Sequence, residues 1–326
     1  MNSTKPIASL SLDLDNKWSY MKTHGDSGWE TFPTYLETAV PRSLAFFKER
    51  DLAITYFIVG QDAALEKNRE ALAQIPAAGH EIGNHSFNHE PWLHLYSKEQ
   101  LTREFEQAEA AIESATGRRP IGFRGPGFSL SATVEEVLAE RGYKYDCSKF
   151  PTYIGPLARA YYFLRSPKMS QDEREKRKKL FGTFGDGFVT LKPHVLNVNG
   201  RKLMEIPVTT FPAVKTPIHF SYLLYLACFS EAAARLYFNA ARRVCKLSGV
   251  EPSMLLHPLD FLDAGDAPEL EFFPAMNMDH RKKIELLNEF VGSLTRDFET
   301  VTLGEHAEIA GKSGQPLTST DPAAVQ

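Results

Sequence analysis

The chain of 326 residues has little net charge, few cysteines and no long apolar run. A formal net charge of −4 supplies no general cationic field for nucleic-acid phosphates, so nucleic acid is not an expected partner. The three cysteines include no CxxC pair, which indicates neither a disulfide framework nor a cysteine-rich zinc site. No run of about 18 apolar residues predicts a transmembrane span, and the first ten residues lack the pattern of a secretory signal. We therefore expect a cytoplasmic protein.

What the sequence does contain is an alternation of short apolar strands with amphipathic helices. Helices are indicated at 133–141 and 279–296, around Pro41 as a first-turn residue, and from the Ser97 and Gln100 capping box to Gly117. The alternation predicts a largely parallel sheet, closed or open, with its ligand site at the carboxyl ends of the strands. The strands are predicted at residues 7–13, 53–59, 121–123, 204–208 and 254–256.

The first group of candidate site residues is acidic and closes the first predicted strand. Asp13 and Asp15 lie two residues apart, so their carboxylates face the same way and repel each other unless a cation or a proton intervenes. An acidic pair of this kind is by itself typical of a solvated strand end or a cap. It becomes a candidate ion site only when other ligands are added.

Two histidines supply such ligands. His85 and His89 lie four apart, a spacing that on one face of a helical turn lets both imidazoles reach one metal. Together with Asp15 they make the protein ligand set of an open catalytic zinc site. Histidine pairs are also common in cores and on surfaces, and His80 and His94 offer other pairings.

Two further motifs follow predicted strands. In the segment 124–128, Arg124 can orient and hold ionised a carboxylate such as Asp13, and the glycines permit close backbone approach to a ligand. A plain tight turn is the alternative, because Gly-Pro-Gly is strong turn chemistry by itself. His257 follows the strand at 254–256, where an imidazole can act as a general acid near neutral pH or simply precede a turn.

Five segments in this order resemble the motifs of one family. SLDLD, HSFNH, RGPGF, GYKYD and LLHP stand in the order, and at roughly the separations, of the motifs of polysaccharide deacetylases, carbohydrate esterase family 4 with the NodB homology domain. The resemblance covers about residues 7–257. It implies an α/β fold, an irregular (β/α)7-type barrel, and metal-dependent removal of an acetyl or formyl group from an amino sugar. Zinc is the metal that it favours, with cobalt, nickel or manganese as alternatives.

The resemblance also implies roles for the residues at the matching motif positions. The catalytic residues that it gives are the base Asp13, the general acid His257, Arg124 and Asp146. Arg124 steadies the base, and Asp146 is the expected partner of Arg124. The metal ligands are Asp15, His85 and His89, and the substrate-facing residues are Pro126 and Gly127. In this reading the metal lowers the pKa of its bound water from 15.7 to about 7, and the N–H of Gly127 meets the oxyanion.

Two positions depart from the usual family motifs. The first motif usually has adjacent aspartates, whereas Leu14 separates them here, which is similar to members that act on lipid-linked sugars or non-polymeric amides. The third motif usually has an aromatic residue where Gly127 stands, so we expect a more open substrate-facing wall.

The domain prediction is a single NodB-like deacetylase domain over residues 1–310, with a disordered tail at 311–326. The rhythm of strands and helices breaks at 156–246, which is expected to be an insertion or a helical cap. Its aromatic and basic part, 157–180, is interpreted as a solvated cap, with peripheral contact to an anionic membrane at the inner face as the alternative.

The expected substrate is an acylated amino sugar of a polysaccharide, an oligosaccharide or a lipid-linked saccharide precursor. A chain without an export signal favours a biosynthetic substrate over insoluble polymers outside the cell. The alternatives are a cyclic-amide (ureide) hydrolase of the same fold and a non-catalytic saccharide-binding descendant.

Overall fold

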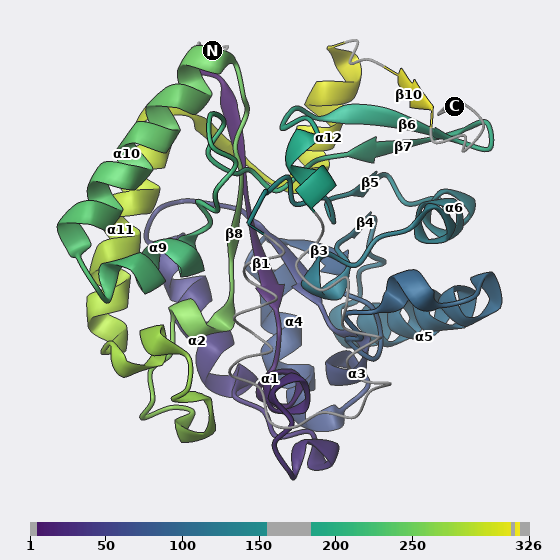
Figure 1. The fold of residues 1–326 in the computed structure, drawn as a ribbon. Helices are drawn as coiled ribbons and strands as arrows, with labels where there is room; N and C mark the ends of the chain where they lie inside the picture. Colours follow the sequence, from purple (N-terminus) through teal and green to yellow (C-terminus); the bar gives the residue numbers. More distant parts are fainter. Residues whose placement is uncertain (1–4, 155–183, 314–316, 320–326) are drawn as a thin grey trace.

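Seven parallel strands form a curled sheet around which the helices are wrapped (Figure 1). The computed structural model describes residues 5–154, 184–313 and 317–319. Each neighbouring pair among the seven is parallel, so the carboxyl ends of all seven strands lie at one end of the sheet. In spatial order the strands are β7 (Arg201–Glu205), β5 (Tyr145–Asp146), β4 (Gly122–Phe123), β3 (Glu81–Asn84), β2 (Thr55–Ile58), β1 (Ile7–Leu14) and β8 (Ser253–Leu256).

Three more strands extend the sheet at its margins. β6 (His194–Val198) runs antiparallel to β7, β10 (Leu317–Ser319) pairs with β6, and β9 (Glu299–Val301) pairs with the start of β1. The two ends of the parallel set meet near Thr209, whose N–H donates to the carbonyl of Ser253 at 3.0 Å. The N–H of Ser253 in turn donates to the Thr209 hydroxyl at 2.8 Å. The irregular barrel expected from the sequence is confirmed.

Strand β1 shows how the sheet separates its two faces. All eight of its residues are buried. Because successive side chains point to opposite faces, Leu10, Leu12 and Leu14 join the apolar core under the helices, whereas Ser11 and Asp13 point to the inner face. A strand buried on both faces is typical of a parallel sheet covered by helices.

The outer helices follow the predicted pattern with shifts at their ends. α5 carries the predicted capping box of Ser97 and Gln100 and ends at left-handed Gly117, as expected. The prediction for Pro41 is wrong, because α2 begins five residues before it and Pro41 lies inside the helix. The helices outside the inner face are α1 (Lys17–His24), α2 (Leu36–Lys48), α3 (Gly60–Ala63), α4 (Arg69–Ala77), α5 (Lys98–Thr116), α6 (Ala132–Glu140), α9 (Phe220–Ala227), α10 (Glu231–Ser248) and α11 (His280–Asp297).

One helix fills the inner face instead. α12 (Leu303–Lys312) places Leu303, Ala307 and Ala310 in an apolar cluster with side chains of β2, β5 and β7. Its first N–H groups donate to the Thr55 hydroxyl and to the Glu81 carboxylate, at the amino ends of β2 and β3. α12 therefore closes the amino end of the barrel and leaves the carboxyl end for a site.

The described part of the segment 156–246 contains the barrel strand β7 and the helices α9 and α10, and α10 packs beside α11 (Figure 1). The aromatic and basic part at 157–180 lies outside the described residues, so the insertion or cap stays a prediction. Of the predicted tail, residues 317–319 form β10. Among the described helices, none has the length and apolar character that crossing a bilayer requires.

Candidate metal and acid–base site

The strand register brings the motif residues to one end of the barrel. Leu12 pairs with Leu256, so Asp13 and His257 are the next residues on adjacent strands. Leu14 pairs with Ile58, and Ile58 pairs with Asn84, so the row that follows contains Asp15 and His85. Neighbouring parallel strands lie about 4.8 Å apart, so these side chains share one small region.

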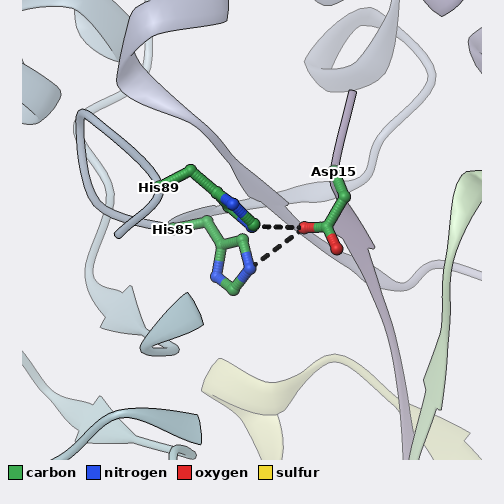
Figure 2. A group of neighbouring side chains, drawn as sticks. All are labelled: Asp15, His85 and His89. Atoms are coloured by element: carbon green, nitrogen blue, oxygen red, sulfur yellow. Dashed lines mark hydrogen bonds and ion pairs between the residues drawn. The ribbon is translucent and has the colours of Figure 1, made fainter. Parts of the chain in front are cut away.

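Three of these side chains converge on one point (Figure 2). Oδ1 of Asp15 lies 3.1 Å from Nε2 of His85 and 2.9 Å from Nε2 of His89. The ligand atoms of all three lie within 4.8 Å of one another, and the three residues are buried. A carboxylate and two imidazoles at such distances make a set of donors that can hold one divalent ion.

The histidine pair reaches this point from a loop. β3 ends at Asn84, and residues 85–89 are not helical, so the predicted helical turn is wrong. Ser86 and His89 both adopt left-handed backbone conformations, and the N–H of His89 donates to the Ser86 hydroxyl at 3.1 Å. The Glu104 carboxylate of α5 accepts the N–H groups of Phe87 and Asn88. The loop is therefore held in shape by α5.

Each imidazole has one nitrogen turned to the shared point. Nδ1 of His85 lies 2.7 Å from the carbonyl of Arg124, so it donates a proton there and leaves the lone pair of Nε2 free for an ion. Nδ1 of His89 is buried and has no hydrogen-bond partner among the described residues. The tautomer of His85 that an ion requires is thus fixed by the protein.

The local charges favour a cation at the shared point. Burial alone would raise the pKa of Asp15, but the neighbouring His89 and His85 outweigh it and lower that pKa well below its ordinary value. Burial alone would lower the pKa of His85, but Asp13 and Asp15 outweigh it and raise that pKa. Two buried carboxylates therefore hold positive charge beside them.

Asp13 belongs to a second, adjoining group. Its Oδ1 accepts a hydrogen bond of 2.6 Å from Nη1 of Arg124, and both side chains are almost completely buried. The same guanidinium donates to the Ser11 hydroxyl and to the carbonyl of Cys147. Burial alone would lower the pKa of Arg124, but Asp13 raises it above its ordinary value, so the arginine stays charged.

The expected pairing of Arg124 with Asp146 is wrong. Phe123 and Asp146 are paired in register and share a face, so Arg124, one residue later, points to the opposite face. The Asp146 carboxylate instead accepts the hydroxyl of Ser148 at 2.6 Å, and the Ser148 oxygen accepts the N–H of Gly125 at 2.8 Å. Burial raises the pKa of Asp146. Asp146 thus supports the Arg124 loop through Ser148.

That loop presents a backbone donor at the surface. Pro126 is buried and opens a single 3-10 turn, Pro126–Phe128. Gly127 is exposed, has φ of 58°, and lies at the second helical position, where the N–H has no partner inside the helix. A Cβ on Gly125 would lie 2.2 Å from the carbonyl oxygen of Ser129, so this tight turn requires glycine there.

His257 is held from two directions. Its Nδ1 lies 2.8 Å from the hydroxyl of Ser221 on α9, and that hydroxyl lies 2.8 Å from Oδ2 of Asp260. Oδ2 of Asp260 also accepts the backbone N–H of His257 at 2.9 Å. Sequence reasoning missed Ser221, for which the sequence carries no signal, and Asp260, which stands three residues after His257.

Two tyrosines and a buried acid surround Asp15, and the sequence did not reveal them. The Tyr35 hydroxyl donates to the Asp15 carbonyl at 2.6 Å. Burial, reinforced by the charge of Asp15, raises the pKa of Tyr20 and Tyr35 well above the ordinary value, so both hydroxyls remain donors. Oδ1 of Asp62 accepts the side-chain N–H groups of Asn16 and Trp18, which flank the start of α1. Burial raises the pKa of Asp62 to about 7.

The two spare histidines lie elsewhere. Nδ1 of His80 accepts the N–H of Ile54 ahead of β2, at the amino end of the barrel. Nδ1 of His94 lies 2.9 Å from the Ser129 hydroxyl. The alternative ligand pairings that include these residues do not form.

Comparison with known proteins relates part of the chain to one family. Residues 21–145 match the Polysaccharide deacetylase family, a stretch that includes His85, His89 and Arg124. The similarity to this family is thus found over this stretch of the chain. The resemblance seen in the sequence is thereby confirmed, while Asp13, Asp15 and His257 lie outside the matched stretch.

Curated relatives are similar to parts of the chain. A peptidoglycan deacetylase of Helicobacter pylori is 33% identical over 112 residues, which are 34% of this chain and 37% of that protein. A peptidoglycan-N-acetylglucosamine deacetylase of Bacillus cereus is 29% identical over 144 residues, 43% of this chain and 61% of that protein. The chain thus spans about a third to three fifths of the length of these relatives.

Solved structures agree on the fold. A Mycobacterium smegmatis structure assigned to the polysaccharide deacetylases superimposes with a TM-score of 0.66 and 18% identity, and the match covers 99% of this chain and 96% of that one. PuuE allantoinase superimposes with a TM-score of 0.59 and 18% identity over 98% and 94% of the two chains. At such identities the likeness concerns the fold alone.

Proposed function

We propose that this protein is a metal-dependent hydrolase that removes an N-acetyl or N-formyl group from an amino sugar. One observation carries the proposal: three candidate ligands, a carboxylate held by a buried arginine, and a histidine linked to a second carboxylate meet at one end of the barrel. Hydrolysis of an amide needs an activated water, a stabilised oxyanion and a protonated leaving nitrogen. The end of the barrel has a group for each task.

Asp15, His85 and His89 would hold the ion, and their chemistry suits zinc, with cobalt, nickel and manganese as alternatives. The fit rests on the buried convergence of the three donors and on the tautomer of His85 that the Arg124 carbonyl selects. When bound, the ion polarises the acyl carbonyl and makes water more acidic.

Asp13 is the base in this proposal. Arg124 neutralises its charge in the buried site and binds its Oδ1, so the carboxylate stays oriented for a water. As the water attacks the acyl carbon, Asp13 accepts its proton. The exposed N–H of Gly127 is the proposed donor to the oxyanion that forms.

His257 is the proposed acid. An amine leaves poorly as an anion, so the C–N bond breaks only when the nitrogen receives a proton. With Nδ1 occupied by Ser221, His257 has Nε2 for the substrate. The proton therefore moves from Nε2 to the departing amine.

The proposed substrate is an acylated amino sugar within a saccharide, soluble or lipid-linked. Relatives named as deacetylases of peptidoglycan and chitin support the amino-sugar class. Gly127 leaves the substrate-facing loop without a bulky side chain, which supports a substrate other than a packed polymer. The cytoplasmic location, the membrane contact and the single domain at 1–310 remain predictions.

The test is a deacylation screen of the purified protein loaded in turn with zinc, cobalt, nickel and manganese. The panel holds N-acetyl and N-formyl amino sugars, their oligomers, a lipid-linked form and a cyclic ureide. We expect acetate or formate release, and Asp13→Asn should reduce it by about 10² to 10⁴ fold. Ring opening alone would favour the ureide hydrolase instead. If no substrate reacts and no stoichiometric metal remains after gentle purification, the alternative function, non-catalytic saccharide binding, would be favoured.

A further inference from the structure

We infer that Ser221 is a positioning residue for the proposed acid, because it connects His257 to the buried carboxylate of Asp260. The inference rests on the proposed function for its catalytic consequence. The hydroxyl of Ser221 lies 2.8 Å from Nδ1 of His257 and 2.8 Å from Oδ2 of Asp260, so one atom bridges the two residues. The three side chains form a continuous chain of hydrogen bonds from the barrel wall to the imidazole.

Asp260 is tied to the main chain of His257. It follows His257 by three residues in a 3-10 turn, and its Oδ2 accepts the backbone N–H of His257 at 2.9 Å. Its carboxylate is thereby directed at the backbone of His257 and at the Ser221 hydroxyl. Ser221 therefore supplies the connection from a different element, α9.

The hydrogen positions along this chain follow from the partners. Oδ2 of Asp260 already accepts one N–H, and a carboxylate oxygen accepts a second donor in the same way. The Ser221 hydroxyl therefore donates to Asp260 and accepts from Nδ1–H of His257. That arrangement fixes the proton of neutral His257 on Nδ1, so the proton that the imidazolium gives up comes from Nε2.

Helix α9 holds Ser221 firmly. Ser221 is the second residue of α9, and Phe220, directly before it, and Leu223, two residues after it, are completely buried in the main core. The N-cap residue His219 accepts the N–H of Tyr222 through Nδ1, which fixes the start of the helix. Burial lowers the pKa of His219 to about 3, so this neighbour remains neutral beside His257.

The consequence concerns leaving groups. Without Ser221 the Nδ1–H of His257 loses its acceptor, so the imidazole can rotate or change its tautomer, and delivery of the Nε2 proton suffers. Substrates whose leaving group needs a proton should be affected, whereas an aryl acetate, whose phenolate leaves without one, should not be. A purely structural role for Ser221 would affect both substrate types alike.

The experiment compares Ser221→Ala with Ser293→Ala in the full-length, metal-loaded protein. Ser293 is a matched control because it is buried and, among the described residues, its hydroxyl bonds to the Phe290 carbonyl within its own helix α11. For Ser221→Ala we expect kcat on the acylamino sugar to fall 10- to 100-fold with little change in KM, and hydrolysis of 4-nitrophenyl acetate to stay within about twofold. Ser221→Thr, which keeps the hydroxyl, should recover most of the loss. Equal losses on both substrates, or no loss on either, would overturn the inference.

A second measurement does not depend on activity. Long-range ¹H–¹⁵N NMR spectra of histidine-labelled protein, with His257 assigned through His257→Gln, report which ring nitrogen carries the proton. We expect the Nδ1–H form in the wild type and in Ser293→Ala, and a shift toward Nε2–H in Ser221→Ala. Identical tautomers in all three proteins would reject the bridge. A wild type that hydrolyses nothing but shows the Nδ1–H form would reject the proposed function and retain the bridge.

Discussion

Asp13 and Arg124 are joined by a hydrogen bond of 2.6 Å between Oδ1 and Nη1 inside the barrel, where both side chains are almost completely buried. Because the guanidinium also reaches Ser11 and the Cys147 carbonyl, one side chain joins β1, the end of β4 and the chain after β5. The proposed base is therefore part of the framework of the barrel.

Replacing the arginine should damage both stability and activity. Arg124→Met leaves Asp13 buried without its partner, which costs about 3–5 kcal/mol of unfolding free energy. Urea unfolding measures this loss, and acyl release should fall at least 100-fold where the variant still folds. The control is Arg119→Met: the Arg119 side chain is exposed, and Glu109 keeps its second partner Arg141, so this ion pair contributes at most about 1 kcal/mol. Similar unfolding curves for both variants would contradict the framework role.

The zinc content of purified variants should distinguish the candidate ligands from the other histidines. His85→Ala and His89→Ala each remove one donor from the set of three, so we expect zinc affinity to fall by at least 100-fold. Elemental analysis after gel filtration and competition with a chelator measure the change. His94→Ala is the matched control, because its imidazole bonds to Ser129, and it should retain zinc like the wild type. Loss of zinc in the control, or retention in the others, would disprove the assignment.

Asp62 should make stability depend on pH. Its pKa in the folded protein is raised by burial from 3.8 to about 7, although hydrogen bonds from Asn16 and Trp18 oppose this. Between those values the folded state binds more protons than the unfolded state, so the contribution of Asp62 to stability is lost as pH rises toward 7. The full loss is about 4 kcal/mol.

The measurement is urea unfolding of wild type and Asp62→Asn at several pH values between 4 and 8. The variant does not titrate at this position, so its stability relative to the wild type should increase with pH and level off above 7. A difference between the two proteins that stays constant across this range would show that Asp62 is ionised throughout.

The inner face of the barrel should not tolerate a methyl group at Gly122. A Cβ there would lie 1.9 Å from Cζ of Tyr145, whose ring fills the interior beside β4. Gly122→Ala should therefore destabilise the protein by about 3 kcal/mol or more, or prevent folding. Gly292→Ala in α11 should stabilise it by about 0.5–1 kcal/mol, because its new methyl group meets only the Arg296 side chain at 4.0 Å. Thermal unfolding measures the stability of both variants, and a change in the same direction in both would contradict this prediction.

Local patterns predicted much of the fold and of the site. The strands were recognisable because β-branched and apolar residues recur between turn residues, and α5 because its capping box and final glycine are local signals. The alternation of side chains along a strand could also have excluded the pairing of Arg124 with Asp146. Apolar Phe123 shares a face of the sheet with Asp146, so the next residue, Arg124, must face the other way.

Other features depend on contacts that no local pattern contains. Ser221 reaches His257 because α9 packs against β8, although the two residues are 36 positions apart in the sequence. The loop that carries His85 and His89 depends on left-handed backbone at two residues that are not glycine and on Glu104 of a separate helix. The position of α12 was equally hidden, because an amphipathic helix does not reveal which face of a sheet it will cover.

The location of α12 has a consequence for folding during translation. Phe57, Tyr145 and Met204 are synthesised long before Leu303, Ala307 and Ala310, their partners in the inner cluster. Until α12 emerges, the nascent chain has an open apolar interior facing water. We expect folding to finish only after translation of α12, so chaperones would have to protect the unfinished barrel during nearly all of its synthesis.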